Sequence, residues 1–323
     1  MSVSRLAPVA LFAFNRPETT LATLQALQRC DGFQGRQFYL FCDGPRQSRP
    51  EDLAAVTTVR QLLHSWAVGQ RAECLFSDLN RGLRASIVGG VREVLSNHPQ
   101  VIVMEDDIIA APGYLRFMQQ SLDALQEVST VWQVSGYFVP HHRWLVKPGF
   151  LSLPCCWGWG TWRDRWSRYC DDAADLAERI GGSDVRRFNI DGTYDYFGDL
   201  QANAEGRLNT WHVRWYASMF LEQALAWYPG RSLTRNIGFD AGGTHCSSSV
   251  LAQVFHGQRL GRCPAVVQPG TEAVESAELR QTLQRFYRYQ QQIWAGMNWR
   301  RRARVQLGSL LRRAGLLSGK GAR

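Results

Sequence analysis

Three consecutive acidic residues, Glu105, Asp106 and Asp107, interrupt an otherwise apolar stretch of the chain. Adjacent carboxylates repel one another and lose solvation when buried chain flanks them, so a cation or hydrogen-bond donors must compensate them. Carboxylate oxygens are the ligands that Mg²⁺ and Mn²⁺ prefer. The three acids therefore predict a site for one of these ions, with solvated loop residues or a helix cap as the alternative interpretation.

The apolar run before the acids, residues 101–104, predicts a buried strand, because a short and mostly β-branched run after a turn is typical of a parallel sheet. Side chains alternate along a strand, so we expect Glu105 and Asp107 on one side and Asp106 on the other, unless the backbone turns there. Open α/β sheets hold phosphate-bearing ligands at the carboxyl ends of such strands.

Strands and helices are expected to alternate over the first hundred residues. Strands are predicted at residues 8–14, 37–44, 72–78 and 101–104, and helices at residues 16–29, 51–67 and 82–98. This alternation predicts an α/β fold in which helices flank a mostly parallel sheet.

Polar residues follow three of these strands: Asn15 and Arg16, then Asp43, then the three acids. The carboxyl ends of parallel strands meet at one edge of a sheet, so these groups should converge. An arginine, a lone acid and a metal site together suit a nucleotide that carries a diphosphate. Neither GxxxxGK[ST] nor GxGxxG follows the first strand, so metal and arginine would have to neutralise the phosphates.

Four tryptophans fall within ten residues of a glycine-rich segment: Trp157, Trp159, Trp162 and Trp166. Flat aromatic faces with polar rims suit stacking on sugar rings, which makes Trp157 and Trp159 candidate acceptor contacts. Core packing is the alternative for each of them. Residues 171–210 are polar and weakly periodic, which predicts a mobile loop or lid, and residues 210–226 predict a helix.

The charge of the chain is concentrated at its end. Of the net charge of +9, residues 300–323 contribute +8, from seven arginines and one lysine without an acid, so the basicity does not indicate a nucleic-acid partner. Leucines at helical spacing in this tail predict a basic amphipathic helix on an anionic membrane surface. A docking helix or a frayed end is the alternative.

The sequence shows neither a signal-peptide pattern nor an apolar run of membrane-spanning length, which predicts a cytoplasmic protein or a peripheral one on the inner membrane face. A hydrophobic content of 45% is typical of a globular protein. The eight cysteines form no CxxC pair, so neither a zinc module nor a redox motif is indicated.

Seven short motifs occur in a fixed order: FNR, CDG, EDDIIAAPGYLRFM, SGYF, WGWGTWRDRW, TWHVRW and RNIGFDAGGTHC. Together they resemble nucleotide-sugar glycosyltransferases of the GT-A (Rossmann-like) fold, and most closely bacterial sugar transferases related to the N-acetylglucosaminyltransferase I group. The resemblance covers roughly residues 8–247. It implies a nucleotide-sugar-binding half at residues 1–125, an acceptor-side half at residues 126–260, and a helical extension with the basic tail at residues 261–323.

The activity that the resemblance implies is transfer of a hexosyl or N-acetylhexosaminyl unit. The donor would be a nucleoside-diphosphate sugar, with a UDP-sugar favoured, and the acceptor a glycan or a lipid-linked glycan. Mn²⁺ or Mg²⁺ would be the cofactor, and inversion at the anomeric carbon is expected of the family. Nucleic acid is not an expected partner.

The resemblance also implies roles for single residues on the donor side. Arg16, with Asn15 in the same motif, would contact the nucleotide, and Asp43 would bind the uracil edge. Glu105 and Asp106 would lie around the ribose and the sugar. Asp107 would ligate the metal.

Further roles concern the diphosphate and the catalytic base. Arg84 is a second arginine that could assist the leaving diphosphate. Where relatives often carry a basic carboxylate, this chain has His212, and an imidazole can do the same work. The alternative is that His212 is only a surface residue and that the base is Asp195, Asp199, Glu222 or Asp240. His245 could complete the metal shell or touch the diphosphate, or it could be hydrogen-bonded only locally.

Two other functions fit part of the pattern. A nucleotidyltransferase would share the acidic metal ligands, but it would normally carry a glycine-rich loop with a lysine after the first strand, where this chain has FAFNRPETT. A non-catalytic carbohydrate- or nucleic-acid-binding protein would use the tryptophans for stacking. Strongly salt-sensitive binding of oligonucleotides without metal would favour this second alternative.

Overall fold

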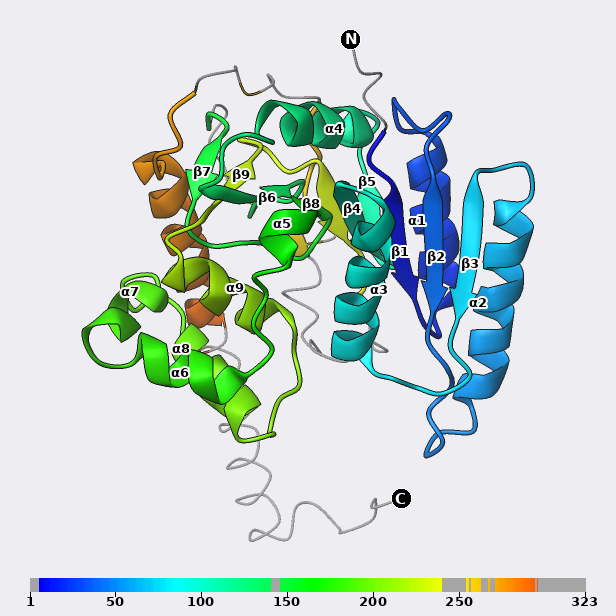
Figure 1. Ribbon diagram of the computed structural model, residues 1–323, viewed down its shortest axis with the longest axis horizontal. Coiled ribbons are helices and arrows are strands. Elements are labelled where there is room, and N and C mark those ends of the chain that lie inside the picture. The colour runs from blue at the N-terminus through cyan, green and yellow to red at the C-terminus, as the bar shows by residue number, and fades with distance from the viewer. Residues whose placement is uncertain are drawn as a thin grey trace, which may run out of the picture.

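A computed structural model describes residues 6–140, 146–239, 254–255, 257–262, 267, 271–293 and 295. Within these ranges the central feature is an eight-stranded sheet with the order β3-β2-β1-β4-β8-β6-β9-β7 (Figure 1). Its strands are β1 (Val9–Ala13), β2 (Phe38–Cys42), β3 (Ala72–Phe76), β4 (Gln100–Glu105), β6 (Val131–Ser135), β7 (Gly149–Leu151), β8 (Trp159–Trp162) and β9 (Leu225–Tyr228).

The first half of this sheet is parallel. β1 lies between β2 and β4 and pairs with both in parallel, and β2 pairs in parallel with β3. β8 is antiparallel to β4 and β6, while β9 is parallel to β6 and antiparallel to β7. The prediction of an α/β fold with a mostly parallel sheet is confirmed. Because β4 pairs with β8, the sheet continues across the boundary expected at residue 125.

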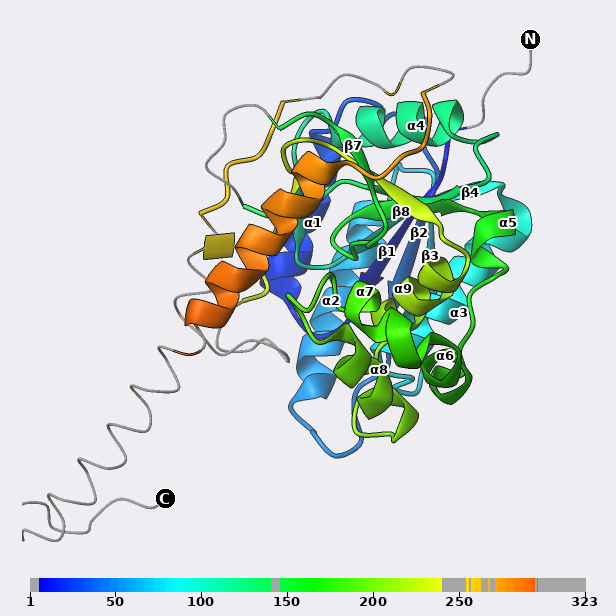
Figure 2. The same cartoon turned by 90° about the vertical axis from the view of Figure 1, so that its left-hand side faces the viewer.

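Helices cover both faces of the sheet (Figures 1 and 2). On one face lie α1 (Pro17–Gln28), α2 (Asp52–Ala67) and α4 (Tyr114–Ala124), and on the other lie α3 (Leu83–Asn97) and α9 (His212–Leu221). Neighbouring residues of a strand point to opposite faces. Leu11 therefore packs in the cluster of α1, α2 and α4, and Phe12 packs in the cluster of α3 and α9.

Residues 171–210, here called the helical lobe, are not the mobile loop that the sequence predicts. They form α6 (Ala173–Ile180), α7 (Val185–Phe188) and α8 (Tyr196–Ala204). The side chains of Asp172 and Asp195 accept backbone N–H groups at the starts of α6 and α8, so acids that are typical of a loop serve as helix caps. α6 buries Ala173, Leu176 and Ile180 at helical spacing, but over only eight residues, so the many polar residues of the segment obscure this period.

The helix predicted over residues 210–226 is also shorter than expected. α9 ends at Leu221, Gln223 has a φ of 52°, and β9 begins at Leu225. An unbroken apolar run does not distinguish a buried helix from a buried strand, because both lack a polar face. The second half of the predicted helix is therefore a central strand of the sheet.

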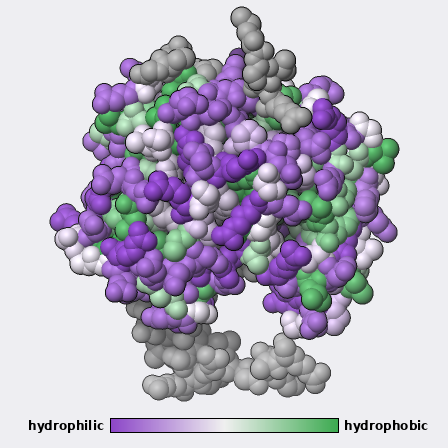
Figure 3. All heavy atoms as spheres, viewed as in Figure 1, coloured by the Kyte–Doolittle hydropathy of each residue, from purple (hydrophilic) through white to green (hydrophobic). Residues whose placement is uncertain are grey.

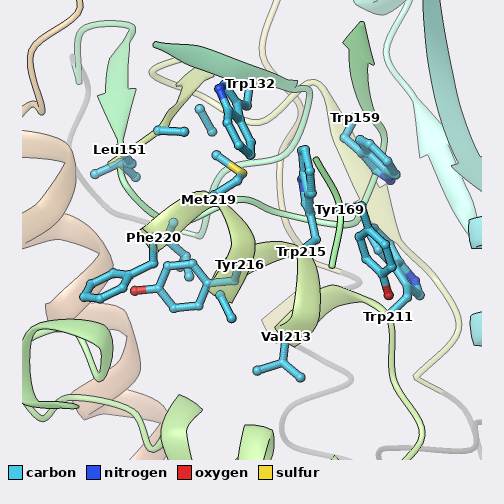
Figure 4. Packing of buried hydrophobic residues seen from close by; sticks show 14 of the residues in the cluster. Trp132, Leu151, Trp159, Tyr169, Trp211, Val213, Trp215, Tyr216, Met219 and Phe220 are labelled. Carbon is cyan, nitrogen blue, oxygen red and sulfur yellow. The ribbon is translucent and has the colours of Figure 1, made fainter. Parts of the chain in front are cut away.

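Aromatic residues fill the space between α9 and the sheet (Figure 4). Trp159 of β8 stacks on Trp211 with ring centroids 5.1 Å apart, and Trp132 of β6 stacks on Trp215 at 5.6 Å. All four tryptophans are buried. These contacts fix α9 against the sheet.

A further helix, over residues 277–293, packs beside the sheet (orange in Figure 2). The predicted amphipathic tail, residues 300–323, lies outside the described residues, as do Asp240 and His245. Among the helices of the described chain, none is both long and apolar enough to cross a membrane.

Candidate active site

Arg16 lies between two of the three acids that follow β4. Its Nη2 atom donates to Asp106 Oδ1 at 2.7 Å and to Asp107 Oδ2 at 2.9 Å. The chain turns at Asp106 and Asp107, so the alternation expected of a continuous strand does not apply here, and these two carboxylates share one partner. The predicted convergence of Arg16 with the acids at the carboxyl ends of β1 and β4 is present. These three residues are called the Arg16 cluster below.

Asp106 also braces the two strands that bear the Arg16 cluster. Its Oδ2 atom accepts the backbone N–H of Phe14 at 3.1 Å, and its carbonyl oxygen accepts the hydroxyl of Thr23 at 3.0 Å. The side chain is only 4% exposed, compared with 28% for Arg16. Asp106 therefore fixes the end of β1 to the end of β4.

Burial and charge act against each other in the Arg16 cluster. Burial lowers the pKa of the Arg16 guanidinium, but the charges of Asp106 and Asp107 outweigh it and hold that pKa above its ordinary value. Burial, together with repulsion from Asp107 and Asp106, raises the pKa of Glu105. A single guanidinium thus faces three carboxyl groups, which leaves negative charge that a cation could neutralise.

The described residues fit a divalent cation only if a bound ligand supplies further oxygen atoms. Within them, no three His, Cys, Asp or Glu side chains are arranged to hold a metal ion together. Asp106 and Asp107 nevertheless present carboxylate oxygens side by side, and Mg²⁺ in nucleotide sites commonly binds one or two carboxylates together with phosphate oxygens of the substrate. The residues fit a metal shared with a diphosphate, and not a closed protein cage.

A glycine that sequence reasoning missed lies against this cluster. The short strands β5 (Ile108–Ala110) and β10 (Thr234–Asn236) pair antiparallel, and Ile237 N–H donates to Asp107 O at 2.9 Å. A Cβ atom on Gly238 would overlap Asp107 Oδ2 and would lie 2.6 Å from Arg16 Nη1. Only glycine lets the chain pass here. The signal in the sequence was the first glycine of the motif RNIGFDAGGTHC.

Asp43 holds backbone groups in place at the same sheet edge. Its carboxylate accepts N–H groups from Gly44 at 3.0 Å, Arg81 at 2.9 Å and Gly82 at 2.8 Å. The residue therefore ties the chain after β2 to the turn that begins α3. This contact explains an acid at that position whether or not it also meets a nucleobase.

Asn15 belongs to a second polar group that the sequence did not reveal. Its Nδ2 atom donates to Asp52 Oδ1 at 2.7 Å, and Arg46 Nη2 donates to the same oxygen at 2.9 Å. Hydrogen bonds from Arg46 hold the pKa of Asp52 low, at about 2. Asn15 directly precedes Arg16 in the chain, so this polar group adjoins the Arg16 cluster. The Arg46 guanidinium also lies over the Phe14 ring, 5.2 Å from its centroid.

Arg84 connects the two halves of the molecule. It forms an ion pair with Asp171, and its Nε atom donates to Asn209 Oδ1 at 2.5 Å. Asp171 also accepts a hydrogen bond from the Tyr169 hydroxyl at 3.1 Å. In this structure the Arg84 guanidinium is thus engaged at the two ends of the helical lobe. Figure 3 shows the molecule hollowed at its lower edge, between this lobe and the first half of the sheet.

The two candidate acceptor contacts differ sharply. Trp159 has no exposed surface, so the prediction that it contacts an acceptor is wrong; β8 turns its ring into the core, onto Trp211. Trp157 is half-buried, and its ring packs edge-on against Tyr137, Phe239 and Phe255. Trp157 remains a candidate because part of it reaches the surface.

Three of the candidate bases differ in their surroundings. His212 begins α9, and its Nε2 atom donates to the Pro154 carbonyl at 3.2 Å; burial lowers its pKa to about 4. Asp195 caps α8 and accepts Gly198 N–H at 3.0 Å. Asp240 lies outside the described residues.

No family model matches the sequence, and no curated protein matches it. Among solved structures, the chain is similar to the galactosyltransferase LgtC in complex with donor and acceptor sugar analogues. The TM-score is 0.37 and the sequence identity is 10%, and the match covers 85% of this chain and 96% of that one. It is also similar to the bifunctional glycosyltransferase WbbM, with a TM-score of 0.26, 10% identity, and coverage of 42% of this chain and 23% of that one. The chain thus spans less than a quarter of WbbM. Structural similarity at this level assigns neither a fold nor a function to this chain.

Proposed function

We propose that the protein is a metal-assisted glycosyltransferase that uses a nucleoside-diphosphate sugar. The observation that carries this proposal is the convergence of Arg16, Asp106 and Asp107 at the carboxyl ends of β1 and β4. Diphosphate-bearing ligands of α/β folds bind at this edge of the sheet. The seven motifs that resemble GT-A enzymes support the same function, and they favour a UDP-sugar as donor and a glycan or lipid-linked glycan as acceptor.

The Arg16 cluster would bind the donor through its diphosphate. Asp107, with Asp106 beside it, would hold Mn²⁺ or Mg²⁺, and the bound ion supplies neutralisation of the charge on the leaving diphosphate. Arg16 would donate to phosphate oxygens with those N–H groups that the two acids leave unused. Since Asp106 and Asp107 fix the guanidinium before the donor arrives, little side-chain ordering remains to be done on binding.

His212 is the base that we propose for the acceptor hydroxyl. Its Nε2 atom donates to Pro154 O, so the neutral ring carries its lone pair on Nδ1. A pKa of about 4 is close to that of an ordinary aspartate, so the ring is unprotonated at neutral pH and can accept a proton. Direct displacement with one such base would invert the anomeric carbon, which proton NMR of the first-formed product would test.

The proposal is tested by thermal unfolding with UDP, GDP, dTDP and CDP, each with and without Mn²⁺. A ligand at about a hundred times its dissociation constant stabilises a protein by about 2.7 kcal/mol. We expect one nucleotide to stabilise the wild type only with Mn²⁺, and not to stabilise Asp107→Asn. Asp175→Asn, an exposed acid of the helical lobe, is the matched control. If no nucleotide raises the unfolding temperature, the proposal is wrong.

A further inference from the structure

A second cavity lies in the acceptor-side half, away from the Arg16 cluster. It has a volume of about 350 Å³ and lies between α7, the end of α9, the start of β9 and the beginning of the helix over residues 277–293. The side chains that matter for its chemistry are Arg187, Asp191, Phe220, Gln223, Glu275 and Arg280. In Figure 1, α7 lies at the far left, whereas β1 and β4 lie on the right.

The polar wall of this cavity is a fixed network. Arg280 donates to Asp191 Oδ2 from Nε at 3.2 Å and from Nη2 at 3.0 Å, and to Glu275 Oε2 from Nη1 at 2.8 Å. Glu275 Oε1 in turn accepts the N–H and the hydroxyl of Ser152, at 2.9 and 2.7 Å. Donors and acceptors are therefore already oriented before any ligand enters.

Equal numbers of positively and negatively charged side chains line the cavity. Arg187 and Arg280 face Asp191 and Glu275, so an anion would meet two carboxylates and a cation would meet two guanidinium groups. A neutral hydroxyl can both donate to a carboxylate and accept from a guanidinium. Leu225 is partly exposed and adds a small apolar surface of the kind on which the C–H groups of a sugar pack. Phe220 and Ala224 are buried behind it, and the Arg187 guanidinium lies 4.3 Å from the centroid of the Phe220 ring.

Residues with left-handed backbone conformations lie at or beside this cavity. Among the described residues, the non-glycine residues with positive φ are Ile190 at 51°, Asp191 at 57° and Gln223 at 52°. Asp191 and Gln223 line the cavity, and Ile190 is adjacent to Asp191. This conformation is a genuine outlier for a β-branched residue such as isoleucine. Strained residues of this kind concentrate at binding and catalytic sites.

We propose that this cavity is a binding site for a neutral sugar unit, separate from the donor site. The fixed network would bind sugar hydroxyls, and the apolar side would contact the ring. If the protein transfers sugars, the unit would belong to a part of the acceptor glycan distant from the reacting hydroxyl. That last assignment rests on the proposed function, whereas the binding itself does not.

The test is saturation-transfer NMR and calorimetric titration of the full chain with the methyl glycosides of glucose, galactose, mannose and N-acetylglucosamine. Inorganic phosphate serves as the anionic comparison. Glu275→Gln removes one charge from the cavity lining without a change in length, and Arg187→Gln removes another together with the guanidinium end of the side chain. Arg186→Gln, the neighbouring exposed arginine of α7, is the matched control, and Asp107→Ala disables the proposed donor site without touching the cavity.

We expect at least one glycoside to bind saturably. The loss of a charged hydrogen-bond partner should weaken that binding at least about tenfold in Arg187→Gln and Glu275→Gln. Arg186→Gln and Asp107→Ala should bind as the wild type does, and this holds even if no nucleotide binds the protein. The proposal is overturned if no glycoside binds, if phosphate is preferred, or if Asp107→Ala abolishes the binding. If Glu275→Gln fails to fold, Arg187→Gln still tests the proposal, because the Arg187 side chain is mostly exposed.

Discussion

Arg84 and Asp171 form an ion pair across 87 residues of sequence, and this pair joins α3 to the helical lobe. The same guanidinium binds Asn209, so one side chain of α3 holds both ends of the lobe. The turn that precedes Arg84 is fixed in its place by Asp43. A continuous set of contacts thus leads from the carboxyl end of β2 to the helical lobe.

We expect the Arg84–Asp171 pair to contribute modestly to stability but strongly to the order of the lobe. Both side chains are partly exposed, so a double-mutant cycle with Arg84→Ala and Asp171→Ala should give a coupling of about 0.5 to 1 kcal/mol at low salt, and less at high salt. Limited proteolysis within residues 171–210 should become faster in Arg84→Ala. The exposed pair Arg179–Asp175, within α6, is the control. Unchanged cleavage of the lobe would show that Arg84 does not hold it.

Gly238→Ala should damage the Arg16 cluster while leaving most of the fold intact. The added methyl group would meet Asp107 Oδ2 and Arg16 Nη1, and overpacking of this kind costs about 1 to 3 kcal/mol. Thermal unfolding should show this loss together with the absence of nucleotide-dependent stabilisation. Gly89→Ala, on the open side of α3 where a methyl group meets nothing, should be neutral or stabilising. If Gly238→Ala binds the nucleotide as the wild type does, Gly238 is not required for the proposed donor site.

His212 should make stability depend on pH in the acidic range. Its pKa is about 4 in the folded protein and ordinarily about 6.5, so the unfolded chain binds more protons between these values. Stability should therefore fall by about 2 kcal/mol as the pH drops from about 7.5 to about 5. His212→Gln keeps a donor for Pro154 O and should lose this part of the dependence, as measured by urea unfolding at both pH values. Equal slopes in the two proteins would mean that the ring titrates normally.

Trp159→Ala should destabilise the protein because its ring is part of the core. Removal of a fully buried tryptophan costs about 3 to 5 kcal/mol. Trp157→Ala should cost less, since Trp157 is half-buried, but it should raise the KM for an acceptor if that ring contacts one. Urea unfolding and acceptor kinetics separate the two effects. A stable Trp159→Ala protein with a raised acceptor KM would reverse this assignment.

Deletion of residues 299–323 should release the protein from anionic vesicles. This segment carries the arginines and leucines that predict a basic amphipathic helix, and each basic residue near an anionic surface contributes about 1 kcal/mol. Co-sedimentation with phosphatidylserine vesicles is the measurement, and neutral phosphatidylcholine vesicles are the control. Unchanged co-sedimentation of the shortened chain would remove the case for a peripheral location on the inner membrane face.

The features that follow from local pattern and strand direction could be predicted from the sequence. Apolar runs of four to six residues placed β1, β2, β3 and β4, and parallel strand ends brought Arg16 to the acids. Features that depend on distant partners could not. Gly238 matters only because β10 pairs with β5, and Asp52 matters only because Asn15 and Arg46 meet it.

The tryptophan segment shows the same limit at the level of single residues. Trp157 and Trp159 are two positions apart and chemically identical, yet one reaches the surface and the other is part of β8. Their difference arises from the pairing of β8 with β4 and β6, which no property of the segment itself reveals.

The pairing of β4 with β8 has a mechanical consequence. A protein whose two halves are separate domains can release product by hinge bending, but here that motion would have to break the backbone hydrogen bonds between Gln100–Glu105 and Trp159–Trp162. Such a sheet resists bending between its two halves. Any opening would then fall to elements that rest on the sheet. For the helical lobe it would mean breaking the ion pairs that Arg84 and Arg280 make with it and uncovering side chains that are buried against α9, such as Leu176 and Phe188.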